Sequence, residues 1–120
     1  MQGSKDVILS YHKAMQSGNY SGARQLLHDN LEFQGPIETF HKADDYIHAL
    51  QKLSAIVDHI DILKVFEDGN DVCLLCDLVT KTLGTSFVVE WYKVKEGKIA
   101  SVRAVFDARP FAAMFAKGSS

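Results

Sequence analysis

Two segments near the end of the chain, TSFVVEWYKVK (85–95) and KIASVRAVF (98–106), decide the fold. Both alternate apolar and polar residues and are rich in β-branched and aromatic side chains, which is typical of strands with one buried face. Glu96–Gly97 joins them as a hairpin turn. Two earlier β-rich segments, 60–67 and 72–82, flank the turn sequence DGND (68–71). The second half of the chain therefore predicts a meander of long strands.

The first half of the chain has helical spacing instead. Apolar residues recur three and four positions apart over 5–17 and again over 42–53. Ser4 is the expected N-cap of the first helix, and Gly18 its left-handed end. A second, short helix is expected after Asn19, whose side chain suits the N-cap position.

Two shorter segments complete the predicted fold. Residues 31–34 alternate like a strand, which Gly35–Pro36 ends. Pro110 suits the first turn of a tail helix with apolar positions at Phe111, Met114 and Phe115. The length of 120 residues allows one domain, 1–120. The sequence predicts an α+β fold in which three helices pack on one face of a curved antiparallel sheet.

Composition and charge exclude several functional classes. The net charge is −2 and the charges are interspersed, so no basic stripe is present to bind nucleic acid. No apolar run approaches the ~20 residues that a membrane span requires. The N-terminus lacks a secretory signal pattern, so we expect a cytoplasmic protein with no membrane partner.

Cys73 and Cys76 form a C-x-x-C pattern, but they fall within a predicted strand. Residues three apart on a strand point to opposite faces and lie about 10 Å from each other. Such a pair can neither chelate one ion nor close a disulfide. We expect two small buried side chains, no metal site and no cofactor.

Two stretches resemble the SnoaL-like and ketosteroid isomerase-like proteins of the nuclear transport factor 2-like superfamily. One is YHKAMQSGNYSG (11–22) with LLHDN (26–30), and the other is WYKVKEGKI (91–99) with VRAVFD (102–107). The resemblance covers nearly the whole chain. It implies a cone-shaped sheet in the cystatin-like manner, closed by helices around an apolar pocket, and frequently a homodimer.

The same resemblance suggests site residues. In the isomerase branch a carboxylate base works with an oxyanion hole made of a tyrosine and a protonated carboxylic acid. The family tyrosine aligns with Tyr11, the protonated acid with Glu90, and the base with Gly35, which cannot abstract a proton. The resemblance therefore implies an oxyanion half without its usual base.

The residues around Glu90 support two interpretations. On a strand, Glu90 shares a face with Val88 and Tyr92, and a carboxyl facing an apolar cavity is driven toward its neutral form. The alternative places Glu90 on the solvent face, paired with Lys93. Asp107 is the candidate replacement base, and its alternative role is to cap the tail helix or to pair with Arg109.

Alternation and helical spacing also suggest an apolar wall for the pocket. Val102, Ala104 and Phe106 are expected to face inward from the last strand; the alternative is plain core packing. His12 is expected to be a surface or junction residue. The predicted ligand contacts are Met15, Phe33, Gln34, Tyr46, Leu50, Val88, Tyr92, Val102, Ala104 and Phe106.

Three functions remain open at this point. The first is a protein that binds a small hydrophobic carbonyl compound or phenol, with isomerase, cyclase or dehydratase activity if Asp107 or a histidine acts as base. The second is a non-catalytic dimerisation or interaction module that uses Phe87, Val89 and Trp91. The third is a relative whose pocket is filled by side chains.

Overall fold

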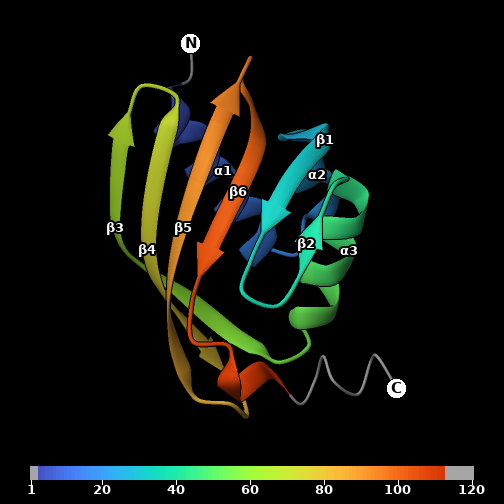
Figure 1. Ribbon diagram of the computed structural model, residues 1–120, viewed down its shortest axis with the longest axis vertical. Helices are drawn as coiled ribbons and strands as arrows, with labels where there is room; N and C mark the ends of the chain where they lie inside the picture. The colour runs from blue at the N-terminus through green and yellow to red at the C-terminus, as the bar shows by residue number, and fades with distance from the viewer. Residues whose placement is uncertain (1–2, 113–120) are drawn as a thin grey trace.

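The computed structural model describes residues 3–112 of the chain. Three α-helices and six strands occur in this range (Figure 1). In chain order they are α1 (Ser4–Gln16), α2 (Tyr20–Gln25), β1 (Leu27–Gln34), β2 (Thr39–Phe40), α3 (Ala43–Leu53), β3 (Val57–Asp68), β4 (Asp71–Thr80), β5 (Thr85–Lys95) and β6 (Lys98–Val105), followed by a short 3-10 helix (Arg109–Phe111).

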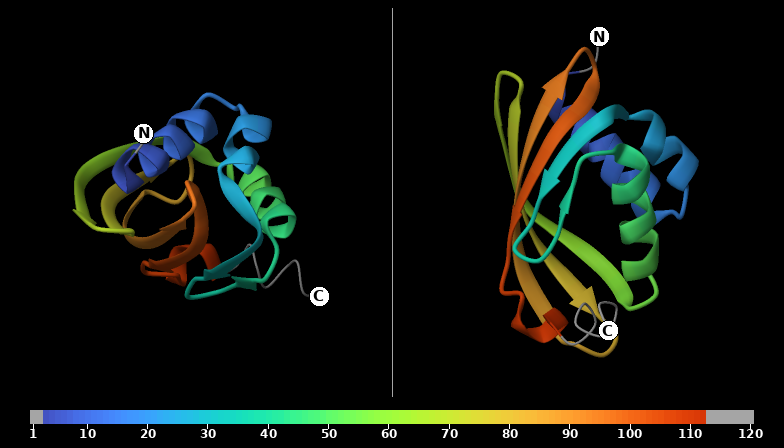
Figure 2. Two further views of the ribbon diagram at one scale, coloured as in Figure 1. Left: turned by 90° about the horizontal axis from the view of Figure 1, so that it is seen from above. Right: turned by 45° about the vertical axis from the view of Figure 1, so that its right-hand side comes forward.

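The six strands form one curved sheet in the order β2-β1-β6-β5-β4-β3. The helices lie along one face of it and the other face is bare (Figure 2). This arrangement confirms the predicted α+β fold, with an unclosed sheet that wraps toward the helices. One part of the prediction was wrong, because the sheet is not entirely antiparallel. β1 and β6 run parallel, with Phe33 opposite Val102.

The helix boundaries follow local signals in most places. Gly18 ends α1 with a φ of +77°, as its left-handed prediction requires. The Asn19 side chain accepts a hydrogen bond from the Gly22 N–H at 3.0 Å and caps α2. Ser4 is not the N-cap of α1, however. It is the first helical residue, and Gly3 takes the cap position without a side-chain hydrogen bond.

The first strand is longer than the sequence predicted. β1 begins at Leu27 rather than at residue 31, and the chain then turns back into the two-residue strand β2, where Phe40 lies opposite Phe33. The expected helix at the tail begins as the 3-10 turn with Pro110 in its first turn. Its further apolar positions, Met114 and Phe115, lie outside the described residues.

The core lies between the helices and the inner face of the sheet. Val88, Tyr92 and Val94 of β5 are buried, whereas Phe87 and Trp91, which have the opposite strand parity, are exposed. Glu90 has the same strand parity as Val88 and Tyr92, so it faces the helices. Cys76 is buried and Cys73 is only half-buried on the opposite face, both with free thiols. No helix among residues 3–112 is both long and apolar enough to span a bilayer.

Candidate functional site

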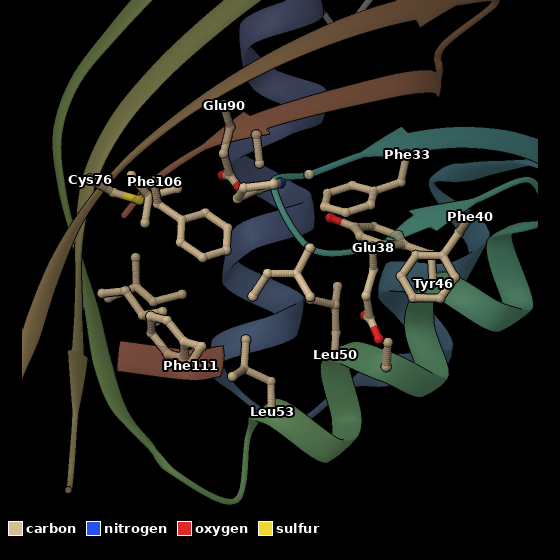
Figure 3. Close-up of a pocket in the computed structure, with 18 of the residues that line it drawn as sticks. Phe33, Glu38, Phe40, Tyr46, Leu50, Leu53, Cys76, Glu90, Phe106 and Phe111 are labelled. Carbon is tan, nitrogen blue, oxygen red and sulfur yellow. The ribbon is translucent and has the colours of Figure 1, made fainter. Parts of the chain in front are cut away.

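A cavity of about 160 Å³ lies between α3, the loop after β1 and the inner face of the sheet (Figure 3). Its wall is mostly apolar, and the acidic groups in it are Glu38 and Glu90. A dry apolar cavity of about 150 Å³ is known to accept benzene, so this one matches a single aromatic ring. The apolar side chains around it include Phe33, Leu50, Leu53, Val88, Phe106 and Phe111.

Glu90 enters the cavity from β5 and is held there by two neighbours. The Tyr92 hydroxyl donates a hydrogen bond to Glu90 Oε1 at 2.7 Å. His12 Nε2 lies 2.9 Å from the Tyr92 oxygen and 3.4 Å from Glu90 Oε1. Because Tyr92 gives its single proton to Glu90, His12 is the donor to Tyr92. Both contacts fall on Oε1, and among the described residues Oε2 accepts no hydrogen bond.

These contacts correct the expectation that Glu90 is un-ionised. Burial by itself raises the pKa of Glu90, but the hydrogen bond and charge of His12, together with the Tyr92 hydrogen bond, outweigh it. The pKa of Glu90 is therefore below its ordinary value, and the side chain is a carboxylate at neutral pH. An ionised Glu90 accepts hydrogen bonds and donates none.

His12 was expected to be a surface or junction residue, and this was wrong. It is 5% exposed and lines the cavity from α1. Its position four residues after the buried Ile8 places both on one face of the helix, and this spacing could have identified it. Histidine is polar, so the sequence favours an exposed position for it. The sequence does not show that Tyr92 and Glu90 lie on the opposite side of the core and bind its ring.

Tyr11 is buried but does not line the cavity. Its hydroxyl donates to the Tyr46 hydroxyl at 3.4 Å, a long contact, and burial raises the pKa of both phenols above their ordinary value. Tyr46 does line the cavity, and its ring stacks on Phe33 at a centroid distance of 4.7 Å. The phenol that the cavity presents is thus Tyr46, with Tyr11 behind it.

The loop after β1 supplies a carboxyl that the sequence analysis did not identify. Gly35 lines the cavity where the family base aligns, and Glu38, three residues later, lines it too. The Gly35 N–H donates to the Glu38 carbonyl at 2.9 Å, which closes the loop. Burial raises the pKa of the Glu38 carboxyl, although the Lys52 charge on α3 opposes this. Loops have no helical or strand periodicity, so the sequence does not predict which way the Glu38 side chain points.

Apart from Asp107, the predicted site residues divide into three groups. Seven of the thirteen predicted site residues line the cavity: Phe33, Tyr46, Leu50, Val88, Glu90, Ala104 and Phe106. Tyr11, Tyr92 and Val102 are buried behind it. Met15 lines a separate hollow between the ends of α1 and α3, and Gln34 lines a hollow over β1 and β6.

Asp107 does not come together with Glu90 in the structure. It is exposed, absent from the cavity lining, and bound by Arg109 through both carboxylate oxygens at 2.6–3.1 Å. The Arg109 side chain and backbone N–H lower the pKa of Asp107 to about 2. A carboxylate with so low a pKa is a weak base, and its geometry is that of the alternative role in which it pairs with Arg109.

The site can therefore bind a small apolar molecule and place polar groups against it. Glu90 offers a charged acceptor, Tyr46 a neutral hydroxyl, and Glu38 a carboxyl with raised pKa. Within residues 3–112 no cluster of His, Cys, Asp and Glu side chains has the geometry to hold a metal ion. Burial raises the pKa of the Cys76 thiol in the wall to about 12, which makes it a poor nucleophile.

Comparisons with known proteins agree on the fold. The family model of the SnoaL-like domain matches residues 8–102. A crystal structure of an NTF2-like protein of unknown function from Cytophaga hutchinsonii is 27% identical, with a TM-score of 0.83 over 93% of this chain and 96% of that one. Curated protein sequences give no match.

Two further structures with the same fold have descriptions that suggest a reaction. IdmH from Streptomyces antibioticus, described as a proposed polyketide cyclase, is 14% identical with a TM-score of 0.80 over 96% of this chain and 99% of that one. A Kribbella flavida protein described as a proposed ketosteroid isomerase is 15% identical with a TM-score of 0.78, over 87% and 77% of the two chains. At these identities the likeness concerns the fold alone.

Proposed function

Because the chain belongs to the SnoaL-like domain family, we propose that it binds a small, single-ring apolar molecule carrying a hydroxyl group in the cavity beside Glu90. The reaction class we propose is proton transfer of the isomerase, cyclase or dehydratase kind. The descriptions of IdmH and of the Kribbella flavida protein are compatible with this class.

One observation carries the proposal: the Glu90 carboxyl, bound by Tyr92 and His12, lines a mostly apolar cavity that matches one ring in size. Of the two ligand types expected from the sequence, the carboxylate favours the phenol. A phenol donates to Oε2 of Glu90, whereas a carbonyl oxygen brings a second acceptor against a negative charge. A hydrogen bond to a charged group contributes about 1.5–3 kcal/mol net.

A matched pair of ligands tests this proposal. 4-Methylphenol and toluene have nearly the same shape and differ in the hydroxyl, so their affinities for wild type are compared by NMR titration at neutral pH. We expect 4-methylphenol to bind about tenfold more tightly or better, in line with that energy range. Glu90→Gln removes the charge at constant size and reduces this advantage, while toluene binding is kept.

A cavity-filling variant is the control for the location of binding. Ala104 lies on β6 in the cavity wall, so Ala104→Leu fills space without adding polarity. It is expected to abolish binding of both ligands in a folded protein. If 4-methylphenol binds no better than toluene, or if Ala104→Leu binds both as wild type does, the proposal is rejected.

A second candidate function rests on the bare face of the sheet. Leu75, Val89 and Val105 lie opposite one another across three adjacent strands, and Phe87 and Trp91 flank Val89 on β5. Val105, Phe87 and Trp91 are 63%, 52% and 44% exposed. We propose a second copy of the chain as the occupant, since an apolar patch of this kind can be self-complementary about a twofold axis.

Sedimentation equilibrium of the full chain tests this second candidate. A wild-type dimer that becomes a monomer in Val105→Asp supports it, and the exposed α3 position Gln51→Asp is the control on the opposite side. A wild-type monomer at concentrations up to the solubility limit rejects it, with no consequence for ligand binding.

A further inference from the structure

Two carboxyl groups line the same cavity from different elements. Glu90 enters from β5 on the sheet, and Glu38 from the loop between β1 and β2, on the side that carries Tyr46 and Leu50 (Figure 3). Their surroundings differ. Glu90 is bound by Tyr92 and His12, whereas among the described residues Glu38 has no hydrogen-bonding or ion-paired side chain, and Lys52 acts on it only through its charge.

We propose that Glu38 is the proton-transfer residue of this cavity, taking a proton from the bound molecule while Tyr46 donates to the oxygen that becomes negative. This inference rests on the proposed function, because it requires that the cavity binds a ligand. It assigns a base to a chain whose aligned base position is Gly35.

The geometry explains why the base comes from Glu38 rather than from residue 35. A Cβ placed on Gly35 would lie 3.0 Å from ring atoms of Phe33, which stacks on Tyr46. A side chain at position 35 therefore requires the Phe33 ring to shift by a few tenths of an ångström. Three residues later the loop has turned, and Glu38 brings its carboxyl to the cavity without displacing the aromatic stack.

The two environments also separate the roles of the carboxyl groups. Desolvation raises the pKa of Glu38, while hydrogen bonds hold the pKa of Glu90 below its ordinary value. Two titratable groups whose pKa values are pushed apart in one site are suited to different roles. The group with the raised pKa is the stronger base, and Glu90, already committed to Tyr92 and His12, is suited to hold a ligand hydroxyl.

The Kemp elimination of 5-nitrobenzisoxazole provides a probe that needs no knowledge of the natural ligand. The Glu38 carboxylate takes the proton on the ring carbon next to nitrogen, and the C–H electron pair becomes part of a C≡N bond. The N–O bond breaks, and its electron pair leaves on oxygen as the phenolate of 2-hydroxy-5-nitrobenzonitrile, which is followed by absorbance. The proton passes from Glu38 to water, so no oxidant or other reactant is needed.

The experiment measures turnover and binding together in the full chain. General-base catalysis contributes about 10²–10⁴-fold. We expect Glu38→Gln to lower kcat by about 10²-fold with the probe still bound, and Glu38→Asp to recover part of the rate. Glu32→Gln is the matched control, because Glu32 lies on the same hairpin but is exposed and paired with His41. The wild-type rate should rise with pH through an apparent pKa above 4.5, because burial raises the pKa of Glu38 and the Lys52 charge opposes this only in part.

Each outcome decides the inference. Loss of rate in Glu38→Gln with binding kept and Glu32→Gln unaffected supports it. Binding without turnover, equal rates in wild type and Glu38→Gln, or a rate that depends on Glu90 and not on Glu38 overturns it and leaves the proposed binding function intact. If 4-methylphenol binds and the larger, bicyclic 5-nitrobenzisoxazole does not, this inference is overturned and the binding function stands. If neither binds, the proposed function and this inference fail together.

Discussion

Replacing Tyr92 by phenylalanine removes one oxygen atom from the centre of the Glu90 network. Tyr92 is fully buried, so the ring keeps its packing and the change is purely polar. The variant loses the 2.7 Å hydrogen bond to Glu90 and the 2.9 Å contact with His12. A hydrogen bond to a charged group contributes about 1.5–3 kcal/mol and a neutral one about 0.5–1.5. We therefore expect Tyr92→Phe to destabilise the fold by about 2–4 kcal/mol at neutral pH.

Tyr11→Phe is the matched control for this variant. Tyr11 is also buried, and its hydroxyl makes one 3.4 Å contact with another neutral hydroxyl. At that length the hydrogen bond is weak, so the expected loss is below about 1 kcal/mol. Urea unfolding followed by circular dichroism measures both. With a slope of about 1–3 kcal/mol per molar urea, Tyr92→Phe should lower the midpoint by about 1 M or more.

The pH dependence gives an independent check on the same network. The folded-state pKa of Glu90 is below its ordinary value of 4.5, so its stabilising contribution is complete above that value. As the pH falls through the lower folded-state pKa, Glu90 is protonated and the contribution is lost. The difference in the free energy of unfolding between wild type and Tyr92→Phe should therefore become smaller at acidic pH. Equal losses for Tyr92→Phe and Tyr11→Phe, or a gap that is constant with pH, would refute the reasoning.

Three further predictions concern the cavity and the two faces of the sheet. Isomerisation of a Δ5-3-ketosteroid should be negligible, because the site matches one ring and has Gly35 at the aligned base position; ultraviolet detection of the conjugated product checks this, and turnover well above the buffer rate contradicts it. Gly35→Asp should give no gain in that activity and should destabilise the fold by about 1–3 kcal/mol, because its Cβ crowds Phe33; a stability equal to wild type would count against the crowding. Cys73 should react with iodoacetamide before Cys76, whose thiol is buried with a pKa of about 12; peptide mass spectrometry distinguishes the two sites, and equal labelling speaks against the assigned faces.

The fold was predictable where its signals are local. Alternation along 85–95 sets which face of β5 is buried. Gly18 marks the end of α1 through its positive φ, and Asn19 marks the start of α2 through its side-chain cap. The start of β1 was not predictable in the same way. Residues 28–30, His-Asp-Asn, have no apolar alternation. They lie between Leu27 and Glu32, which pair with Ile99 and Ser101 of β6, about seventy residues later in the chain.

In the site, too, local features could be predicted from the sequence and long-range contacts could not. The inward direction of Glu90 follows from its parity with Val88 and Tyr92, which the sequence displays. Its charge does not, because the group that lowers its pKa comes from His12, far away in the chain and close only after folding. Glu38 could not be predicted for a different reason. The direction of its side chain is set by a loop that is closed by a backbone hydrogen bond.

The parallel pairing of β1 with β6 has a consequence for synthesis on the ribosome. The β3–β4 and β4–β5 hairpins close through neighbours in the chain, so they can form as soon as they emerge. β1 has to wait, because its main partner is the last strand to be made. Until then the N-terminal third of the chain has no completed sheet to pack on, and long-range pairing of this kind slows folding. A chain terminated after β5 would thus expose two unpaired strand edges, at β1 and at β5. We expect such a chain to be degraded or to aggregate rather than to fold.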